Sequence, residues 1–161
     1  MTTQTHLATP RAGEPAPGFE LNNTDMEMVR LQDYAGKPVI VVFFPAAFSG
    51  VCTAELCQFR DNMTQLNNAN AQVLGISVDL PYSLKPFAEA QGLQFPLLSD
   101  FDGEVIARYG VGFSDFHGFR RPVARRSVFV IDGSGTVTYT WLSDNPGQEP
   151  PYDEVLKAVA E

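Results

Sequence analysis

The sequence predicts an α/β protein with a mixed central β-sheet flanked by helices. Three observations support this class. The unbroken run of β-branched and aromatic residues from Val39 to Phe44 is typical of a strand that is buried on both faces, as in a parallel sheet. A second apolar run follows at 73–78, and the segment between the two runs has helical spacing. Two further strands at 128–142, joined by a glycine-containing turn, predict an antiparallel hairpin, so the sheet combines both kinds of pairing.

The remaining elements follow in order along the chain. Apolar residues recur three or four positions apart from Ser49 to about Asn68, which predicts one helix there. The other expected elements are a hairpin formed by 18–21 and 26–31, a helix at 83–91, a brief strand at 96–98, a short helix at 104–109, strands at 128–132 and 136–142, and a helix at 153–160. This order is typical of a thioredoxin-like fold.

The length of 161 residues fits one domain that can bury a large core without disulfides or metals. Residues 1–12 carry almost no large apolar side chains. We therefore expect a flexible N-terminal tail at 1–12, followed by a single domain at 13–161.

Charge and hydropathy exclude several classes of function. A formal net charge of −8 argues against general binding to nucleic acids or to anionic membranes. No apolar run approaches the roughly 18 residues that span a bilayer. The N-terminal residues lack the apolar core of a secretory signal, which predicts a cytoplasmic protein.

Cys52 and Cys57 are the two cysteines of the chain. In a reducing compartment such a pair indicates catalysis, redox switching or metal binding rather than a structural disulfide. Two scattered histidines complete no zinc-ligand spacing, so we expect no metal and no cofactor. Cys52 follows a strand and a tight loop at a helix start, where free N–H groups and the helix dipole favour a thiolate. These are the surroundings that a nucleophilic cysteine needs.

The residues around Cys52 resemble a known family. Pro45, Ser49 and Cys52 match the peroxiredoxin motif Pro-x-x-x-Thr/Ser-x-x-Cys in order and spacing. The segments 13–19 and 126–132 are similar to the opening segment of the family and to its arginine-bearing strand, so the resemblance covers residues 13 to about 160. It implies a thioredoxin-like fold and a thiol peroxidase. In such an enzyme the peroxidatic Cys52 reduces hydrogen peroxide and organic hydroperoxides and becomes a sulfenic acid.

The chemistry assigns roles to the neighbours of Cys52. Peroxide reduction places negative charge on the leaving oxygen, so the site needs a thiolate and hydrogen-bond donors around both oxygens. Ser49 can hydrogen-bond a peroxide oxygen, although it can also be an N-cap. Pro45 removes a competing backbone donor and shields the pocket. Arg126 supplies positive charge, and Glu55, at the acidic position of the family, can pair with Arg126 and direct its guanidinium.

Cys57 raises the question of how the sulfenic acid is resolved. The spacing Cys-x-x-x-x-Cys resembles the peroxiredoxin Q or bacterioferritin comigratory branch, in which the second cysteine forms an intramolecular disulfide with the first. Five residues of ideal helix place the two Cα atoms about 8.7 Å apart, beyond the roughly 6.8 Å limit for a disulfide. We therefore expect local unfolding before the disulfide forms. A buried core thiol is the alternative reading of Cys57.

Other segments resemble a second branch. The stretches 44–52 and 95–101 are similar to alkyl hydroperoxide reductase E, commonly a one-cysteine enzyme. The resemblance to both branches implies a reductant that is thioredoxin or a similar thiol, and a monomer or weak homodimer. A peroxide sensor or redox relay that uses the same cysteine pair is the alternative function. A thiol-disulfide oxidoreductase is disfavoured because the chain has no Cys-x-x-Cys.

Overall fold

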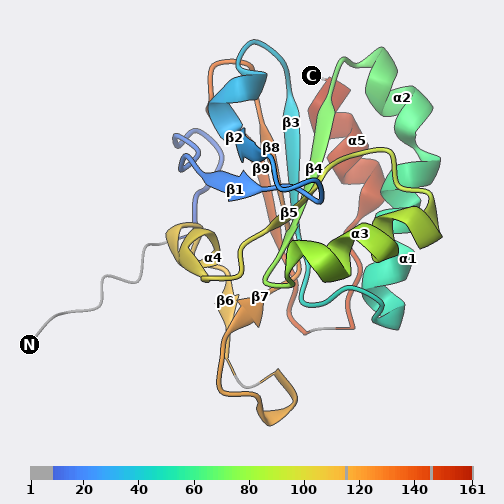
Figure 1. Ribbon diagram of the computed structural model, residues 1–161. Coiled ribbons are helices and arrows are strands. Elements are labelled where there is room, and N and C mark those ends of the chain that lie inside the picture. Colours follow the sequence, from blue (N-terminus) through green and yellow to red (C-terminus); the bar gives the residue numbers. More distant parts are fainter. Residues whose placement is uncertain (1–8, 115, 146, 161) are drawn as a thin grey trace, which may run out of the picture.

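The computed structural model describes residues 9–114, 116–145 and 147–160, apart from the side chain of Cys52. Within these residues, seven strands form one twisted sheet in the order β2-β1-β5-β4-β3-β8-β9, with helices against both faces (Figure 1). The strands are β1 (Glu20–Asn22), β2 (Met28–Arg30), β3 (Val39–Phe43), β4 (Gln72–Ser77), β5 (Leu97–Ser99), β8 (Ser127–Ile131) and β9 (Val137–Leu142). Of the predicted flexible tail at 1–12, residues 1–8 lie outside the described residues.

The centre of the sheet confirms the mixed pairing that the sequence predicts. Strand β3 pairs in parallel with β4 and antiparallel with β8. All five residues of β3 are buried. Alternate residues of a strand point to opposite faces, and accordingly Val39, Val41 and Phe43 join one apolar cluster, whereas Ile40 and Val42 join the other. The core therefore consists of two layers separated by the sheet.

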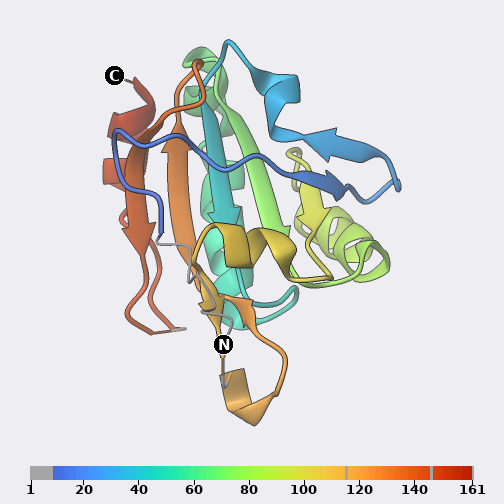
Figure 2. The same ribbon diagram turned by 90° about the vertical axis from the view of Figure 1, so that its left-hand side faces the viewer.

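The helices divide between these two layers. Four helices supply side chains to the layer that contains Ile40 and Val42: α1 (Gly50–Asp61), α2 (Met63–Asn68), α3 (Pro81–Gln91) and α5 (Tyr152–Ala160). Helix α4 (Glu104–Arg108) and the segment around Phe19 cover the opposite face, as the turned view in Figure 2 shows. None of the helices in the described ranges is long and apolar enough to cross a membrane.

The expected helix from Ser49 to about Asn68 is wrong as a single element. The chain forms α1 and α2 instead, with a break at Asn62, whose φ and ψ are −98° and 10°. The side-chain amide of Asn62 donates a hydrogen bond of 2.7 Å to the carbonyl oxygen of Gln58, which competes with continued helix formation.

Several short elements were not expected from the sequence. Strands β6 (Gly112–Phe113) and β7 (Val123–Ala124) pair antiparallel in a separate two-stranded sheet. Among the described residues there are also two 3-10 helices, η1 (Leu31–Tyr34) and η2 (Phe116–Gly118). Elements of two to four residues are too short to show a periodic apolar pattern, which is why sequence reasoning missed them.

Candidate active site

The loop between β3 and α1 carries the predicted motif and is held by contacts at several points. Pro45 is buried two residues after the end of β3. The backbone N–H of Ala47 donates a hydrogen bond of 2.8 Å to Oδ2 of Asp79. Phe48 has a left-handed backbone with a φ of 66°, and its ring packs against Phe87 with ring centroids 5.0 Å apart. A bulky residue in this region of φ is strained, so the surrounding contacts hold the loop in its shape.

Ser49 occupies the N-cap position of α1 but does not cap the helix with its side chain. Its Oγ donates a hydrogen bond of 3.1 Å to the carbonyl oxygen of Ala46. The expectation that the hydroxyl serves as an N-cap is therefore wrong, because the preceding loop offers the hydroxyl a carbonyl acceptor. The donor of Ser49 is used in this contact, while its oxygen lone pairs can still accept a hydrogen bond.

Cys52 is the third residue of α1, so its backbone lies in the first helical turn. The N–H of Thr53 donates a hydrogen bond of 2.9 Å to the carbonyl oxygen of Ser49, four residues back. By helix geometry, the N–H groups before Thr53 lie outside this ladder, where the helix dipole also places positive potential. The side chain of Cys52 lies outside the described part of the structure.

The side chains of Glu55 and Arg126 face each other in the core, between α1 and the residue before β8. Nη1 of Arg126 lies 3.8 Å from Oε1 of Glu55, and the two residues are 3% and 0% exposed. Burial raises the pKa of Glu55 to about 8, although the charge of Arg126 opposes this shift and that of Glu149 adds to it. Arg126 is fixed through its backbone as well, since its carbonyl accepts a 2.9 Å hydrogen bond from the N–H of Ser143.

Glu149 and Tyr152 lie near Glu55 and were missed by sequence reasoning. The hydroxyl of Tyr152 donates a hydrogen bond of 2.6 Å to Oε1 of Glu149. Burial, this hydrogen bond and the nearby charge of Glu55 all raise the pKa of Tyr152. Glu149 lies in a proline-containing segment just before α5, and Tyr152 is the first residue of that helix. Neither carries a periodic or motif signal, so only the folded chain relates them to Glu55.

A cavity of about 240 Å³ opens beside Pro45 and Arg126. Its other lining residues include Phe113, Arg125 and Asn145. The cavity thus combines apolar and polar walls next to the loop that carries the motif. A group of a few heavy atoms can be accommodated at this place without opening the core.

The other arginines of the segment 120–126 have different surroundings. Arg120 is exposed to solvent. Arg121 donates a hydrogen bond of 2.7 Å to the carbonyl oxygen of Phe101 and lies over its ring. Arg125 is partly buried, and its Nε donates to the carbonyl oxygen of Ser143.

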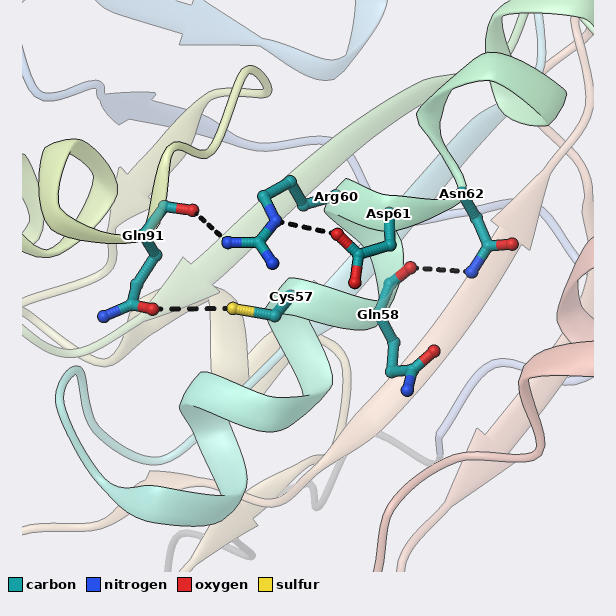
Figure 3. Close-up of polar contacts among 6 residues, drawn as sticks. All are labelled: Cys57, Gln58, Arg60, Asp61, Asn62 and Gln91. Atoms are coloured by element: carbon teal, nitrogen blue, oxygen red, sulfur yellow. Dashed lines mark hydrogen bonds and ion pairs between the residues drawn. The ribbon is translucent and has the colours of Figure 1, made fainter.

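Cys57 lies on α1 as a partly buried free thiol. Its Sγ donates a hydrogen bond of 3.5 Å to Oε1 of Gln91, at the end of α3 (Figure 3). Both cysteine positions belong to one continuous helix, in which five residues span about 8.7 Å between Cα atoms. A disulfide between them requires this part of α1 to unwind. Across the residues that are described, no group of three or more His, Cys, Asp or Glu side chains could hold a metal ion.

Comparison with known proteins gives a consistent result. Residues 12–140 match the model of the AhpC/TSA family. Peroxiredoxin Bcp of Escherichia coli is 42% identical over 132 residues, which are 81% of this chain and 85% of that protein. Alkyl hydroperoxide reductase E of Mycobacterium bovis is 40% identical over 139 residues, 84% of this chain and 87% of that protein. The crystal structure of peroxidoxin BcpB from Mycobacterium tuberculosis superposes with a TM-score of 0.83 at 30% identity, covering 93% of this chain and 96% of that one.

A thioredoxin-like mixed sheet of this kind, with these relatives, defines the class of thiol peroxidases, which are oxidoreductases that reduce peroxides with the help of a thiol reductant. The chain belongs to the AhpC/TSA family, and its relatives within that family are peroxiredoxins. The fold class, the family and the enzyme class that the sequence predicts are thus confirmed. Similarity to both the Bcp and the alkyl hydroperoxide reductase E branches is confirmed as well.

Proposed function

We propose that Cys52 is the peroxidatic cysteine of this thiol peroxidase. Its thiolate attacks one oxygen of a hydroperoxide, the O–O bond breaks, and the other oxygen leaves with a proton as water or an alcohol. Cys52 is oxidised to a sulfenic acid, and the peroxide is reduced by two electrons. Hydrogen peroxide and small organic hydroperoxides are the proposed substrates, and the cavity beside Pro45 supports an organic group of modest size.

The observation that carries this proposal is the contact between Arg126 and Glu55. Glu55 stands three residues after Cys52, and positions three apart share one face of a helix. Through Glu55, the chain brings the guanidinium of Arg126 from a distant segment to the helix end that carries Cys52. A fixed cation at this place stabilises both a thiolate and the negative charge that develops on the leaving oxygen.

The neighbours of Cys52 complete the proposed site. The hydroxyl of Ser49 accepts a hydrogen bond from the peroxide, since its own proton is held by the carbonyl oxygen of Ala46. Pro45 presents no backbone donor and walls the pocket. Glu55 holds the direction of Arg126 without touching the substrate.

In the second step, we propose that Cys57 resolves the sulfenic acid. The sulfur of Cys57 displaces hydroxide from the sulfenic sulfur of Cys52, and together with the thiol proton this gives an intramolecular disulfide and one water. A dithiol such as thioredoxin then reduces the disulfide. Such a dithiol reductant is expected in the cytoplasm, where we propose that the protein works. We propose that it works there as a monomer or weak homodimer.

The test is thioredoxin-coupled peroxide consumption by the wild type, Cys52→Ser and Cys57→Ser. Loss of turnover in both variants, with sulfenic acid still formed in Cys57→Ser, supports the two-cysteine cycle. Full thioredoxin-dependent turnover in Cys57→Ser would contradict the role of Cys57, and retained peroxide reduction in Cys52→Ser would contradict that of Cys52. Slow wild-type turnover with stable disulfide adducts to another protein would instead favour a peroxide sensor.

A further inference from the structure

One residue, Gln91, is contacted twice by the same face of α1. Sγ of Cys57 donates to the side-chain oxygen Oε1 of Gln91 at 3.5 Å, and Nη1 of Arg60 donates to the backbone carbonyl oxygen of Gln91 at 2.6 Å (Figure 3). Cys57 and Arg60 are three residues apart, so their side chains lie next to each other on the helix. Gln91 therefore binds the proposed resolving cysteine and its neighbour with two different groups.

The bond from Arg60 is well placed to be strong. Gln91 is the last residue of α3, and Gly92, with a left-handed φ of 62°, ends the helix. Carbonyl groups at a helix end lack intrahelical donors and carry the negative end of the helix dipole, so a guanidinium is a favourable partner. The Nε of Arg60 also donates to Oδ1 of Asp61 at 3.0 Å, which orients the guanidinium (Figure 3).

The two ends of α1 are held differently. At the C-terminal end, Arg60 ties the helix to α3, and the side-chain amide of Asn62 bonds to the carbonyl oxygen of Gln58. At the N-terminal end, the hydroxyl of Ser49 turns away to Ala46 and makes no capping bond. Because Arg60 and Asn62 hold the C-terminal end, the unwinding that brings Cys52 and Cys57 together is expected to stop near Gln58.

We propose that Gln91 is a positioning residue that controls when Cys57 reacts. The side-chain bond holds Cys57 in the folded helix, and the bond from Arg60 to the backbone of Gln91 keeps the rest of α1 attached to α3. Cys57, Arg60 and Gln91 together form a latch. This inference rests on the proposed function, because it concerns the step in which Cys57 forms the disulfide.

The latch has a consequence at high peroxide. While it is closed, the sulfenic acid of Cys52 persists, and a second hydroperoxide can oxidise it to sulfinic acid with release of water or alcohol. Opening the latch leads to the disulfide, which is protected from this reaction. The strength of the contacts to Gln91 thus sets the balance between resolution and inactivation.

A single-turnover experiment tests the latch. Reduced protein is mixed with limiting hydrogen peroxide, quenched at intervals and analysed by intact mass for the sulfenic, disulfide and sulfinic forms. Gln91→Met keeps the length of the side chain but removes its acceptor, and we expect the disulfide to form roughly fivefold faster, as expected for the loss of one net hydrogen bond. Gln91→Glu restores an acceptor oxygen and should return the rate toward that of the wild type. Arg60→Met should also accelerate disulfide formation, and Arg60→Lys less so.

Matched controls separate the latch from general loosening. Gln94→Ala changes an exposed glutamine three residues away, and Ile106→Val weakens the core on the opposite face of the sheet from α1. Both should leave the rate of disulfide formation as in the wild type, and all variants should form sulfenic acid at the wild-type rate. Less sulfinic acid in Gln91→Met at high peroxide is the second expected result.

Two outcomes would overturn the inference, and they differ from each other. If Gln91→Met resolves at the wild-type rate while Cys57→Ser forms no disulfide, the latch is refuted and the proposed function stands. If the wild type forms no disulfide between Cys52 and Cys57, the latch and the proposed role of Cys57 fail together.

Discussion

Nη1 of Arg126 lies 3.8 Å from Oε1 of Glu55, with both residues almost completely buried. The carboxyl of Glu55 thus faces the guanidinium of Arg126 in the core, away from solvent. The pair also joins two elements that are distant in sequence, the first half of α1 and the start of β8. The orientation of the guanidinium is therefore set by the fold and not by the loop around Cys52 alone.

Arg126→Lys should lower the second-order rate constant for hydrogen peroxide about 100-fold, in the range seen when one donor to a developing oxyanion is removed. An ammonium keeps the charge but cannot present the planar fork of donors that a guanidinium offers. Stopped-flow measurement of peroxide reduction checks this expectation. Arg120→Lys, at an exposed position, is the matched control and should react as the wild type does. An unchanged rate in Arg126→Lys would remove the guanidinium from the mechanism.

Glu55 should make the protein less stable as the pH rises from about 4.5 to about 8. Burial raises the pKa of Glu55 from 4.5 to about 8, so in this range the folded chain keeps a proton that the unfolded chain has lost. When the unfolded state binds fewer protons, the free energy of unfolding falls with increasing pH. Arg126 and Glu149 face the same carboxyl with opposing effects.

Urea denaturation of the wild type and Glu55→Gln across this pH range measures the effect. The variant cannot titrate at position 55 and should show a flatter dependence of stability on pH. Glu89→Gln, on the exposed surface of α3, should follow the wild type. Parallel curves for the wild type and Glu55→Gln would show that this carboxyl is ionised in the folded protein.

The central strand was predictable because its sequence determines it locally. The run from Val39 to Phe44 is apolar on both faces, and the sheet indeed covers both faces of β3. The break between α1 and α2 was not predictable from spacing, since the apolar pattern of Leu56, Phe59, Met63 and Leu66 continues across it. At the break, the side chain of Asn62 hydrogen-bonds to the carbonyl oxygen of Gln58, a contact that leaves no trace in apolar periodicity.

The residues of the candidate site likewise divide into those that the sequence reveals and those that it does not. The motif residues before Cys52 lie within a few positions of one another, so their common loop could be predicted directly from the sequence. Glu149, Tyr152 and Gln91 reach the site only through contacts between distant segments, and nothing in their local sequence marks them. Residues that act through tertiary contacts carry no spacing signal, and the fold is needed to find them.

Gly75→Ala should destabilise the protein by about 1–3 kcal/mol, the usual cost of overfilling a packed core. Gly75 lies in β4, where an added Cβ would stand 2.6 Å from Cδ2 of Leu97 and 3.4 Å from Cε1 of Phe44. Urea denaturation gives the difference directly. Gly18→Ala is the matched control, because an added Cβ there meets nothing within 4 Å. Equal loss in both variants would mean that the close packing at Gly75 is not the cause.

Tyr109→Phe tests how much the contact between the N-terminal segment and the residue after α4 contributes to stability. The ring of Tyr109 packs against Phe43 and Phe129, and its hydroxyl donates a hydrogen bond of 2.7 Å to the carbonyl oxygen of Pro17. Burial raises the pKa of Tyr109, so this hydroxyl is protonated and able to donate at neutral pH.

Phenylalanine keeps the ring contacts but leaves the carbonyl of Pro17 without this donor. We expect the free energy of unfolding to fall by about 1–3 kcal/mol, as is typical when a buried polar group loses its partner. Tyr82→Phe removes a hydroxyl from a side chain that is 75% exposed and should change little. If both variants unfold at the same urea concentration as the wild type, the bond to Pro17 contributes no net stability, and apolar contacts such as those of Phe19 hold this segment on the sheet.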